Sequence, residues 1–150
     1  MGKKRVIEKT EAELLAEKEK LDKTLKKEQQ VKSNQTVRSG RIYILSTYNN
    51  TIISLTDNQG NILAQSSAGK LGFKGTKKGT SFAGSQVAQA IGGLCSQLRV
   101  RNVAIYVKGI GGGRDSALKV LATQGLEIET VKDITPIPHN GCRPKKPRRV

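Results

Sequence analysis

The sequence has no long apolar run, and this absence limits where the protein can act. No stretch approaches the roughly 20 consecutive apolar residues that a membrane-spanning helix needs, and no apolar segment near the start precedes a small-residue cleavage site. A lipid anchor is not indicated either, because Val6 stands where a myristoylation signal has Ser or Thr. The sequence therefore predicts neither insertion into a membrane nor secretion.

Cysteine and histidine are also scarce. Cys95 and Cys142 are the only cysteines, and His139 is the only histidine. Two cysteines do not form a disulfide framework, so we expect free thiols in a reducing cytoplasm. A structural zinc site needs four ligands, and a catalytic Cys-His pair needs an orienting group and a pocket, so His139 and Cys142 do not suffice for either. We expect no metal and no cofactor, and we assign His139 to hydrogen bonding or stacking at a surface contact.

Acidic side chains are few beyond the first 32 residues. No two of them stand in a setting that resembles a general-acid pair or a metal site. We therefore expect no active site, no small-molecule substrate and no enzyme. The acidic residues of this part of the chain are Asp57, Asp115, Glu127, Glu129 and Asp133.

Basic side chains, in contrast, are abundant. The chain has 27 lysines and arginines against 12 acids, which gives a formal net charge of +15. Residues 1–32 are nearly balanced, with ten basic and seven acidic side chains, so most of the excess belongs to residues 33–150. Each cation placed beside a phosphate releases condensed counterions, so this charge favours a polyanionic partner, nucleic acid or an anionic membrane.

The chain divides into three parts. Residues 8–30 are nearly all strong helix formers, but Leu14, Leu21 and Leu25 make too shallow an apolar stripe to favour a coiled coil over a solvated extension. A length of 150 residues suits one domain with a modest core. We expect a charged helical extension and linker over residues 1–36, an α/β domain over 37–138 and an extended basic arm over 139–150.

Patterns within the domain predict five strands and two helices. Three β-rich runs are separated by Asn49-Asn50 and by a Gly-containing turn, which predicts an antiparallel meander. A strand, helix, strand order then predicts parallel strands, and the whole predicts an α/β fold with a mixed β-sheet flanked by helices. The expected strands are residues 41–48, 51–57, 62–67, 102–109 and 126–134, and the expected helices are residues 81–98 and a segment that follows a glycine turn and stops at Gly125.

The glycine turn, residues Gly109–Asp115, follows a strand and opens a helix, where backbone amides can cradle a phosphate. It departs from a dinucleotide fingerprint, which wants glycine in place of Arg114, and from a Walker loop, which wants Gly-Lys-Ser/Thr. Free amides beside Arg114 would still suit an RNA phosphate. Two alternatives stay open: a plain strand-to-helix turn, and a nucleotide-binding enzyme that uses the turn.

Two further segments concentrate positive charge. The basic loop, Lys70–Thr80, combines glycines with lysines, and we expect it to be flexible. The arm contains Pro144 and Pro147 and directly follows Pro138; these prolines oppose helix and central strand, and the arm has no acid. Mobile lysines together with arginine forks suit irregular RNA better than duplex DNA, although a DNA-architectural protein and a set of merely solvated charges remain alternatives. The candidate contacts are Lys70, Lys74, Lys77, Lys78, Arg114, Arg143, Lys145, Lys146, Arg148 and Arg149.

Four segments resemble a known family: TPIPHNGCRP with its basic ending, GFKGTKKGT followed by Phe82-Ala83, YVKGIGGGRDSAL and NNTIISLTDNQGN. They are similar to small-subunit ribosomal protein eleven of the bacterial type, over residues 36–150. The resemblance implies a ribonuclease H-like architecture without nuclease activity. It also implies a place on the platform of the cytoplasmic small subunit, where the protein bridges 16S rRNA helices and helps to form the Shine-Dalgarno cleft that receives mRNA. The implied protein neighbours are small-subunit proteins seven and eighteen and the third initiation factor.

Carried over by residue, the resemblance implies RNA contacts at Lys70 to Lys78, at Arg114 and from His139 to Arg149, Asn140 included. The sequence departs from the family at the glycine turn, where Ile110 and Gly112 replace an alternation of glycine with proline, and in its longer N-terminal extension. The pair Asn140-Gly141 also predicts isoaspartate formation, because glycine leaves the backbone amide unhindered for attack on the asparagine side chain.

Overall fold

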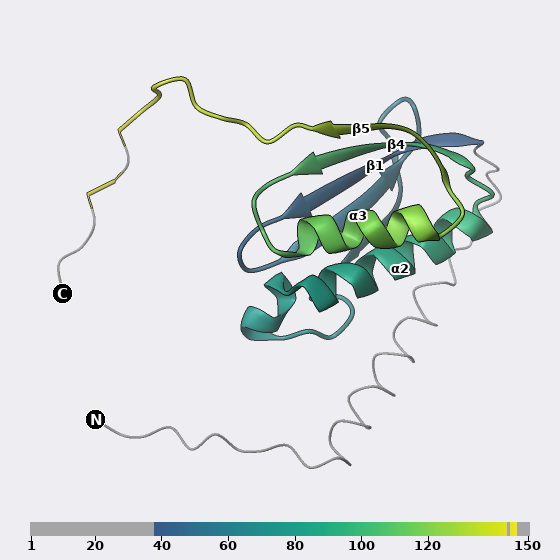
Figure 1. The fold of residues 1–150 in the computed structure, drawn as a ribbon, viewed down its shortest axis with the longest axis horizontal. Coiled ribbons are helices and arrows are strands. Elements are labelled where there is room, and N and C mark those ends of the chain that lie inside the picture. Colours follow the sequence, from purple (N-terminus) through teal and green to yellow (C-terminus); the bar gives the residue numbers. More distant parts are fainter. Residues whose placement is uncertain (1–37, 144, 147–150) are drawn as a thin grey trace, which may run out of the picture.

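The computed structural model describes residues 38–143, 145 and 146. The predicted helix over residues 8–30 and the candidate contacts Arg148 and Arg149 lie outside the described residues. The elements, in chain order, are β1 (Ser39–Ser46), β2 (Thr51–Thr56), β3 (Ile62–Ser67), the 3₁₀ helix η1 (Gly75–Gly79), α2 (Ser81–Gln97), β4 (Asn102–Lys108), α3 (Gly113–Thr123) and β5 (Glu127–Asp133) (Figure 1).

The five strands form one mixed sheet in the order β3-β2-β1-β4-β5. The first three are the predicted antiparallel meander, with Ile44 opposite Ile53 and Ile53 opposite Ser66. β4 pairs in parallel with β1 and with β5. The predicted α/β fold with antiparallel and parallel strands is therefore confirmed. β1 joins the antiparallel part to the parallel part, and β4 lies at the centre of the parallel part.

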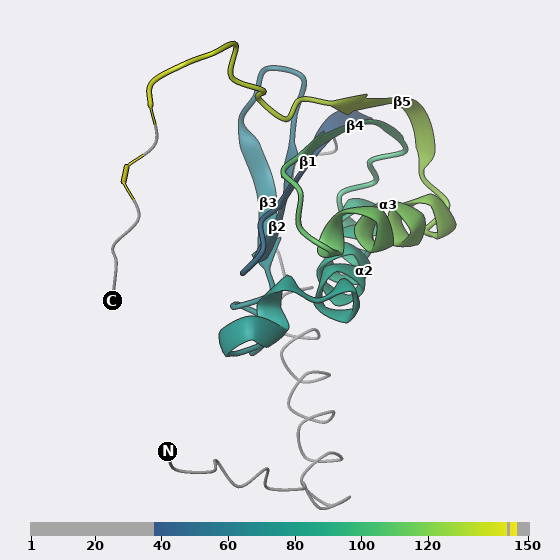
Figure 2. The same ribbon diagram turned by 60° about the vertical axis from the view of Figure 1, so that its left-hand side comes forward.

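Both helices cover the same face of the sheet (Figure 2). The strands alternate accordingly: Ile42 and Ile44 of β1 are buried in the core, while their neighbours Tyr43 and Leu45 are less buried. α2 joins this core through Val87 among others. The predicted flanking by helices thus applies to one face only, and on the other face Tyr43 stacks on Tyr106 at 5.1 Å between ring centroids. Within the described part of the chain, neither helix is long and apolar enough to cross a membrane.

Two local predictions differ from the structure. β1 ends at Ser46 rather than at residue 48, because the amide of Thr47 donates to the carbonyl oxygen of Asn50 at 2.9 Å and closes the β1–β2 turn there. The basic loop is not simply flexible, since it contains η1. Leu71 is buried in the core and Phe73 packs against it, and these two side chains anchor the loop.

The glycine turn fits against the β1–β2 turn without room for a side chain at Gly111 or Gly113. A Cβ atom at Gly111 would overlap the carbonyl oxygen of Thr47, and one at Gly113 would overlap Oγ1 of Thr51. On the other side, a Cβ at Gly79 would overlap the carbonyl oxygen of Tyr48. Glycine at these three positions is therefore explained by close packing of backbone segments, which needs no ligand.

We expect the substitution Gly113→Ala to lower the free energy of unfolding by about 1–3 kcal/mol, the usual cost of overpacking. Gly112→Ala is the matched control, because a Cβ there would meet its nearest atom, the carbonyl oxygen of Gly79, at an ordinary 3.6 Å, and φ is already −65°. The control should change stability by less than about 1 kcal/mol. Urea denaturation of both variants measures the difference, and equal losses would refute the packing explanation.

Candidate nucleic-acid interface

The topology brings the three predicted contact segments to one edge of the sheet. β1, β4 and β5 run in the same direction, so their carboxyl ends lie together (Figure 1). The basic loop leads into α2, the glycine turn leads into α3 and the C-terminal segment follows β5, all at this edge. Carboxyl ends of parallel strands are where α/β proteins commonly bind ligands.

The basic loop presents its lysines in different ways. Lys74 and Lys77 are exposed, whereas Lys78 is half-buried. Lys77 and Lys78 both lie in the last turn of η1. Lys70 is tied to the protein, since its Nζ donates to the carbonyl oxygen of Gln65 at 3.3 Å. Lys74 and Lys77 are therefore the lysines of this loop with the greatest access to a large polyanion.

The glycine turn uses several of its backbone groups internally. The amide of Gly111 donates to the carbonyl oxygen of Ser46 at 3.1 Å. The amide of Arg114 donates to the carbonyl oxygen of Gly111 at 3.3 Å. The hydroxyl of Ser81 donates to the carbonyl oxygen of Gly112 at 3.1 Å and links the turn to α2. These bonds favour a structural strand-to-helix turn over a phosphate cradle.

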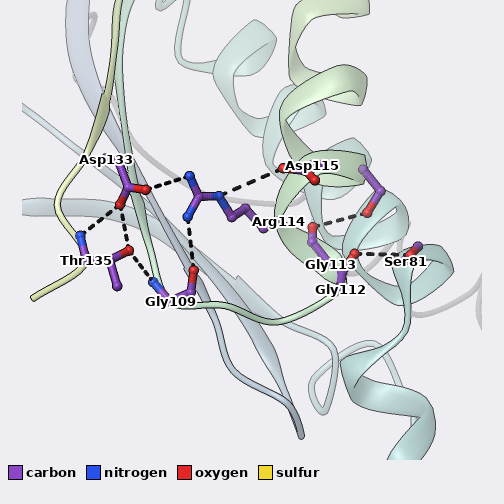
Figure 3. A network of polar contacts seen from close by, with 9 residues as sticks. Ser81, Gly109, Gly112, Gly113, Arg114, Asp115, Asp133 and Thr135 are labelled. Atoms are coloured by element: carbon purple, nitrogen blue, oxygen red, sulfur yellow. Dashed lines mark hydrogen bonds and ion pairs between the residues drawn. The ribbon is translucent and has the colours of Figure 1, made fainter. Parts of the chain in front are cut away.

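Arg114 is also engaged inside the protein (Figure 3). Its Nη2 lies 2.7 Å from Oδ2 of Asp133, and its Nη1 donates to the carbonyl oxygen of Gly109 at 3.2 Å. The more exposed Asp115 is a weaker partner, with Oδ1 3.8 Å from Nε. The guanidinium therefore joins the start of α3 to the ends of β4 and β5, a role that the spacing of these residues along the sequence did not indicate.

Thr135 completes this network. Its hydroxyl donates to Oδ1 of Asp133 at 2.6 Å and accepts from the amide of Gly109 at 3.0 Å, and its own amide donates to the same carboxylate oxygen at 2.9 Å. These bonds from Thr135, together with Arg114, lower the pKa of Asp133 to about 2. The carboxylate therefore stays ionised in mildly acidic solution, at a pH where an unperturbed aspartate begins to take up a proton. We call Arg114, Asp133 and Thr135 the root clamp.

The segment that follows the root clamp is extended and exposed. His139 and Asn140 are both exposed, and Asn140 has a positive φ of 53°. Among the described residues of the arm, Arg143, Lys145 and Lys146 are also exposed. No group of three or more His, Cys, Asp or Glu side chains within the described ranges could hold a metal ion.

Three exposed apolar side chains at this edge were not predicted as contacts. Tyr48 is 76% exposed, Phe82 is 60% exposed and Ile110 is 65% exposed. They belong to the three backbone segments that pack together at Gly79 and Gly111. Tyr48 was missed because the sequence placed it inside a strand, and Phe82 because it was assigned to a helix without regard to its face.

These features define an α/β protein with a basic, partly aromatic edge and no catalytic constellation in its described part. The profile of a family described as Ribosomal protein S11 matches residues 40–149. Small ribosomal subunit protein uS11 of Treponema pallidum is 51% identical over 119 residues, which cover 79% of this chain and 94% of that protein. The protein of the same name from Endomicrobium trichonymphae is 52% identical over 79% of this chain and 91% of its own length. The protein of that name from Solibacter usitatus is 46% identical over 83% of this chain and 93% of its own length.

The chain therefore belongs to the ribosomal protein S11 family. This is a family of structural proteins of the small ribosomal subunit and not of enzymes. The resemblance seen in the sequence motifs is thereby confirmed.

The exposed, left-handed Asn140 generates one chemical prediction. We propose that the amide nitrogen of Gly141 attacks the side-chain carbonyl carbon of Asn140, ammonia leaves, and water opens the resulting succinimide to isoaspartate. A peptide map of the mature particle should show this product at Asn140. The other asparagines, none of which precedes glycine, serve as internal controls. A map with only unmodified Asn140 would reject the proposal.

Proposed function

We propose that the chain binds and bridges helices of 16S rRNA on the platform of the small subunit of cytoplasmic ribosomes. Its neighbours there are small-subunit proteins seven and eighteen, the third initiation factor and the Shine-Dalgarno region of mRNA. The basic loop and the start of the C-terminal segment lie at the same edge of the sheet, and this observation supports the proposal most directly. The known family adds the ribosomal context.

The energy of this binding comes mainly from phosphate contacts, to which Lys74, Lys77, Arg143 and the following basic residues contribute. The anchored basic loop presents its charges on a fixed surface, and the extended arm reaches beyond it. A fixed patch together with an extended arm suits folded RNA, in which separate helices approach one surface from different directions.

The two rival functions have less support. A nucleotide-binding enzyme would need free amides in the glycine turn, but the amides of Gly111 and Arg114 already have partners. Titration calorimetry with common nucleotides tests this rival. A DNA-architectural protein would prefer duplex DNA to structured rRNA when the two compete at matched salt.

Tyr48 supplies a further contact in this proposal. Its backbone packs beside Gly79 at the end of η1, the helix that contains Lys77 and Lys78, and its ring is exposed. Aromatic rings beside cations are typical of surfaces on which unpaired bases stack. Tyr48 would thus stack on a base, while Lys77 and Lys78 neutralise phosphates of the same RNA strand.

Deleting Arg143 to Val150 should reduce the steepness of the slope of log affinity against log salt by roughly 2 to 4. Each contacted phosphate contributes about 0.7 to 0.9 to this slope. Binding of the native and shortened chains to a 16S rRNA transcript over a salt series measures this slope. A full-length variant in which Arg143, Lys145, Lys146, Arg148 and Arg149 are all glutamine controls for the loss of chain length and should flatten the slope equally. An unchanged slope would mean that the arm points into solvent.

Tyr48→Ala should weaken binding to the same transcript by about 1–3 kcal/mol, the usual worth of one stacked base, and should leave the salt slope unchanged. Ile62→Ala is the matched control, because Ile62 is 62% exposed and pairs with Thr56 at the opposite edge of the sheet. Full affinity of Tyr48→Ala would remove the stacking contact from the proposal without touching the role of the arm.

A further inference from the structure

We infer that the root clamp sets the direction in which the C-terminal arm leaves the sheet, and that Arg114 is a positioning residue for the arm rather than a phosphate ligand. The inference rests on the proposed function, because it concerns how the arm meets RNA. It assigns Asp133 and Thr135, neither of which was predicted as an RNA contact, a part in RNA binding without contact to RNA.

Two contacts with the end of β4 fix the chain just after β5. The amide of Ile134 donates to the carbonyl oxygen of Val107 at 2.8 Å, which continues the pairing of β5 with β4. The Thr135 hydroxyl then bridges the Asp133 carboxylate and the amide of Gly109. Because that hydroxyl gives its only proton to the carboxylate and accepts from the amide, its orientation is determined.

Arg114 holds the carboxylate in this place. Its two bonds, to Asp133 and to the carbonyl oxygen of Gly109, span the gap between the end of β5 and the end of β4 (Figure 3). A charge-assisted bond of 2.7 Å is among the shorter and stronger of its kind. Nη1 and Nη2 each give one N–H group to these partners, and the side chain is only about a third exposed, so Arg114 has fewer donors and less exposed surface for a phosphate than a free arginine.

The residues beyond the clamp transmit the fixed direction. Pro136 and Pro138 flank Ile137, and each proline restricts its own φ and the conformation of the residue before it. Such a segment is a semi-rigid spacer that extends by about 3.1 Å per residue. A direction set at Thr135 therefore persists as far as His139, where the basic arm begins. Binding then requires less ordering of the arm, since part of it is already oriented.

A comparison of Asp133 with Asp115 tests this inference, because both carry a negative charge beside Arg114 but only Asp133 belongs to the root clamp. Asp133→Ala removes a negative charge from a basic edge, which by electrostatics alone would strengthen binding to RNA. The clamp predicts the reverse, a loss of about 3- to 10-fold in affinity for the 16S rRNA transcript at fixed salt. Asp115→Ala is the matched control, because it removes the same charge beside Arg114 but only a 3.8 Å contact, and it should not weaken binding. If both variants bind more tightly, the inference is wrong.

Arg114→Ala separates positioning from direct phosphate contact. If Arg114 acts through the arm, the substitution lowers the affinity of the native chain about 3- to 10-fold. In the five-glutamine chain, the variant whose five basic arm residues are glutamine, the same substitution then causes no additional loss of affinity. If Arg114 binds phosphate, the loss persists in the five-glutamine chain and the salt slope falls by about 0.7 to 0.9. The second result would mean that Arg114 binds phosphate directly and would refute its role in positioning the arm. A native chain that fails to bind rRNA at all would instead overturn the proposed function.

The orientation of the arm can also be measured without RNA. Cys142 is exposed, whereas Cys95 is buried and its pKa is raised to about 12 by desolvation, so a nitroxide reagent will label Cys142 selectively. In the labelled native chain, paramagnetic broadening of domain amides should be confined to one region. In Asp133→Ala and Thr135→Val the broadening should extend over more of the domain amides. Thr135→Ser, which keeps the hydroxyl, should retain the native pattern. Intact amide spectra show that each variant is folded, and identical patterns in all of them would refute the inference.

Discussion

The parallel pairing of β4 with β1 and with β5 is the constraint on which the rest of the structure depends. Strands that run in one direction must be joined by crossovers, and here α2 and α3 supply them. Every crossover helix therefore begins at the edge where the strands end. The basic loop, the glycine turn and the C-terminal segment meet at that edge for this reason alone, although they lie far apart in the sequence.

This edge must satisfy two requirements at once. Its backbone segments have to approach closely enough to close the α2–α3 layer over the sheet, which explains the glycines at positions 79, 111 and 113. It must also keep a surplus of like charges in place, and those charges repel one another in the free protein. The acids Asp115 and Asp133 moderate this repulsion locally, and Asp133 does so with a pKa near 2 that keeps it charged.

Arg114 illustrates how a side chain predicted to contact RNA can also have a partner inside the protein. Its type and its place at the start of a helix suggested an anion partner, and the structure does supply an anion, the Asp133 carboxylate of the same chain. The sequence could not reveal this pairing, because Arg114 lies at the start of α3 and Asp133 at the end of β5, and the two come together only through the register of β5 on β4. The exposure of Tyr48 escaped notice for a related reason, since the strand before it ends two residues earlier than its β-forming side chains indicated.

The sequence by itself determined the order of the elements, the meander, the mixed sheet and the family. These follow from apolar periodicity, turn-forming residues and local motifs, all of which act over a few neighbouring positions. Only the tertiary structure decided that both helices share one face, that the basic loop contains an anchored 3₁₀ helix, and that Arg114 holds the root of the arm. Those features depend on contacts between residues distant in the chain, and the energy of such contacts is set by packing and register that no local pattern encodes.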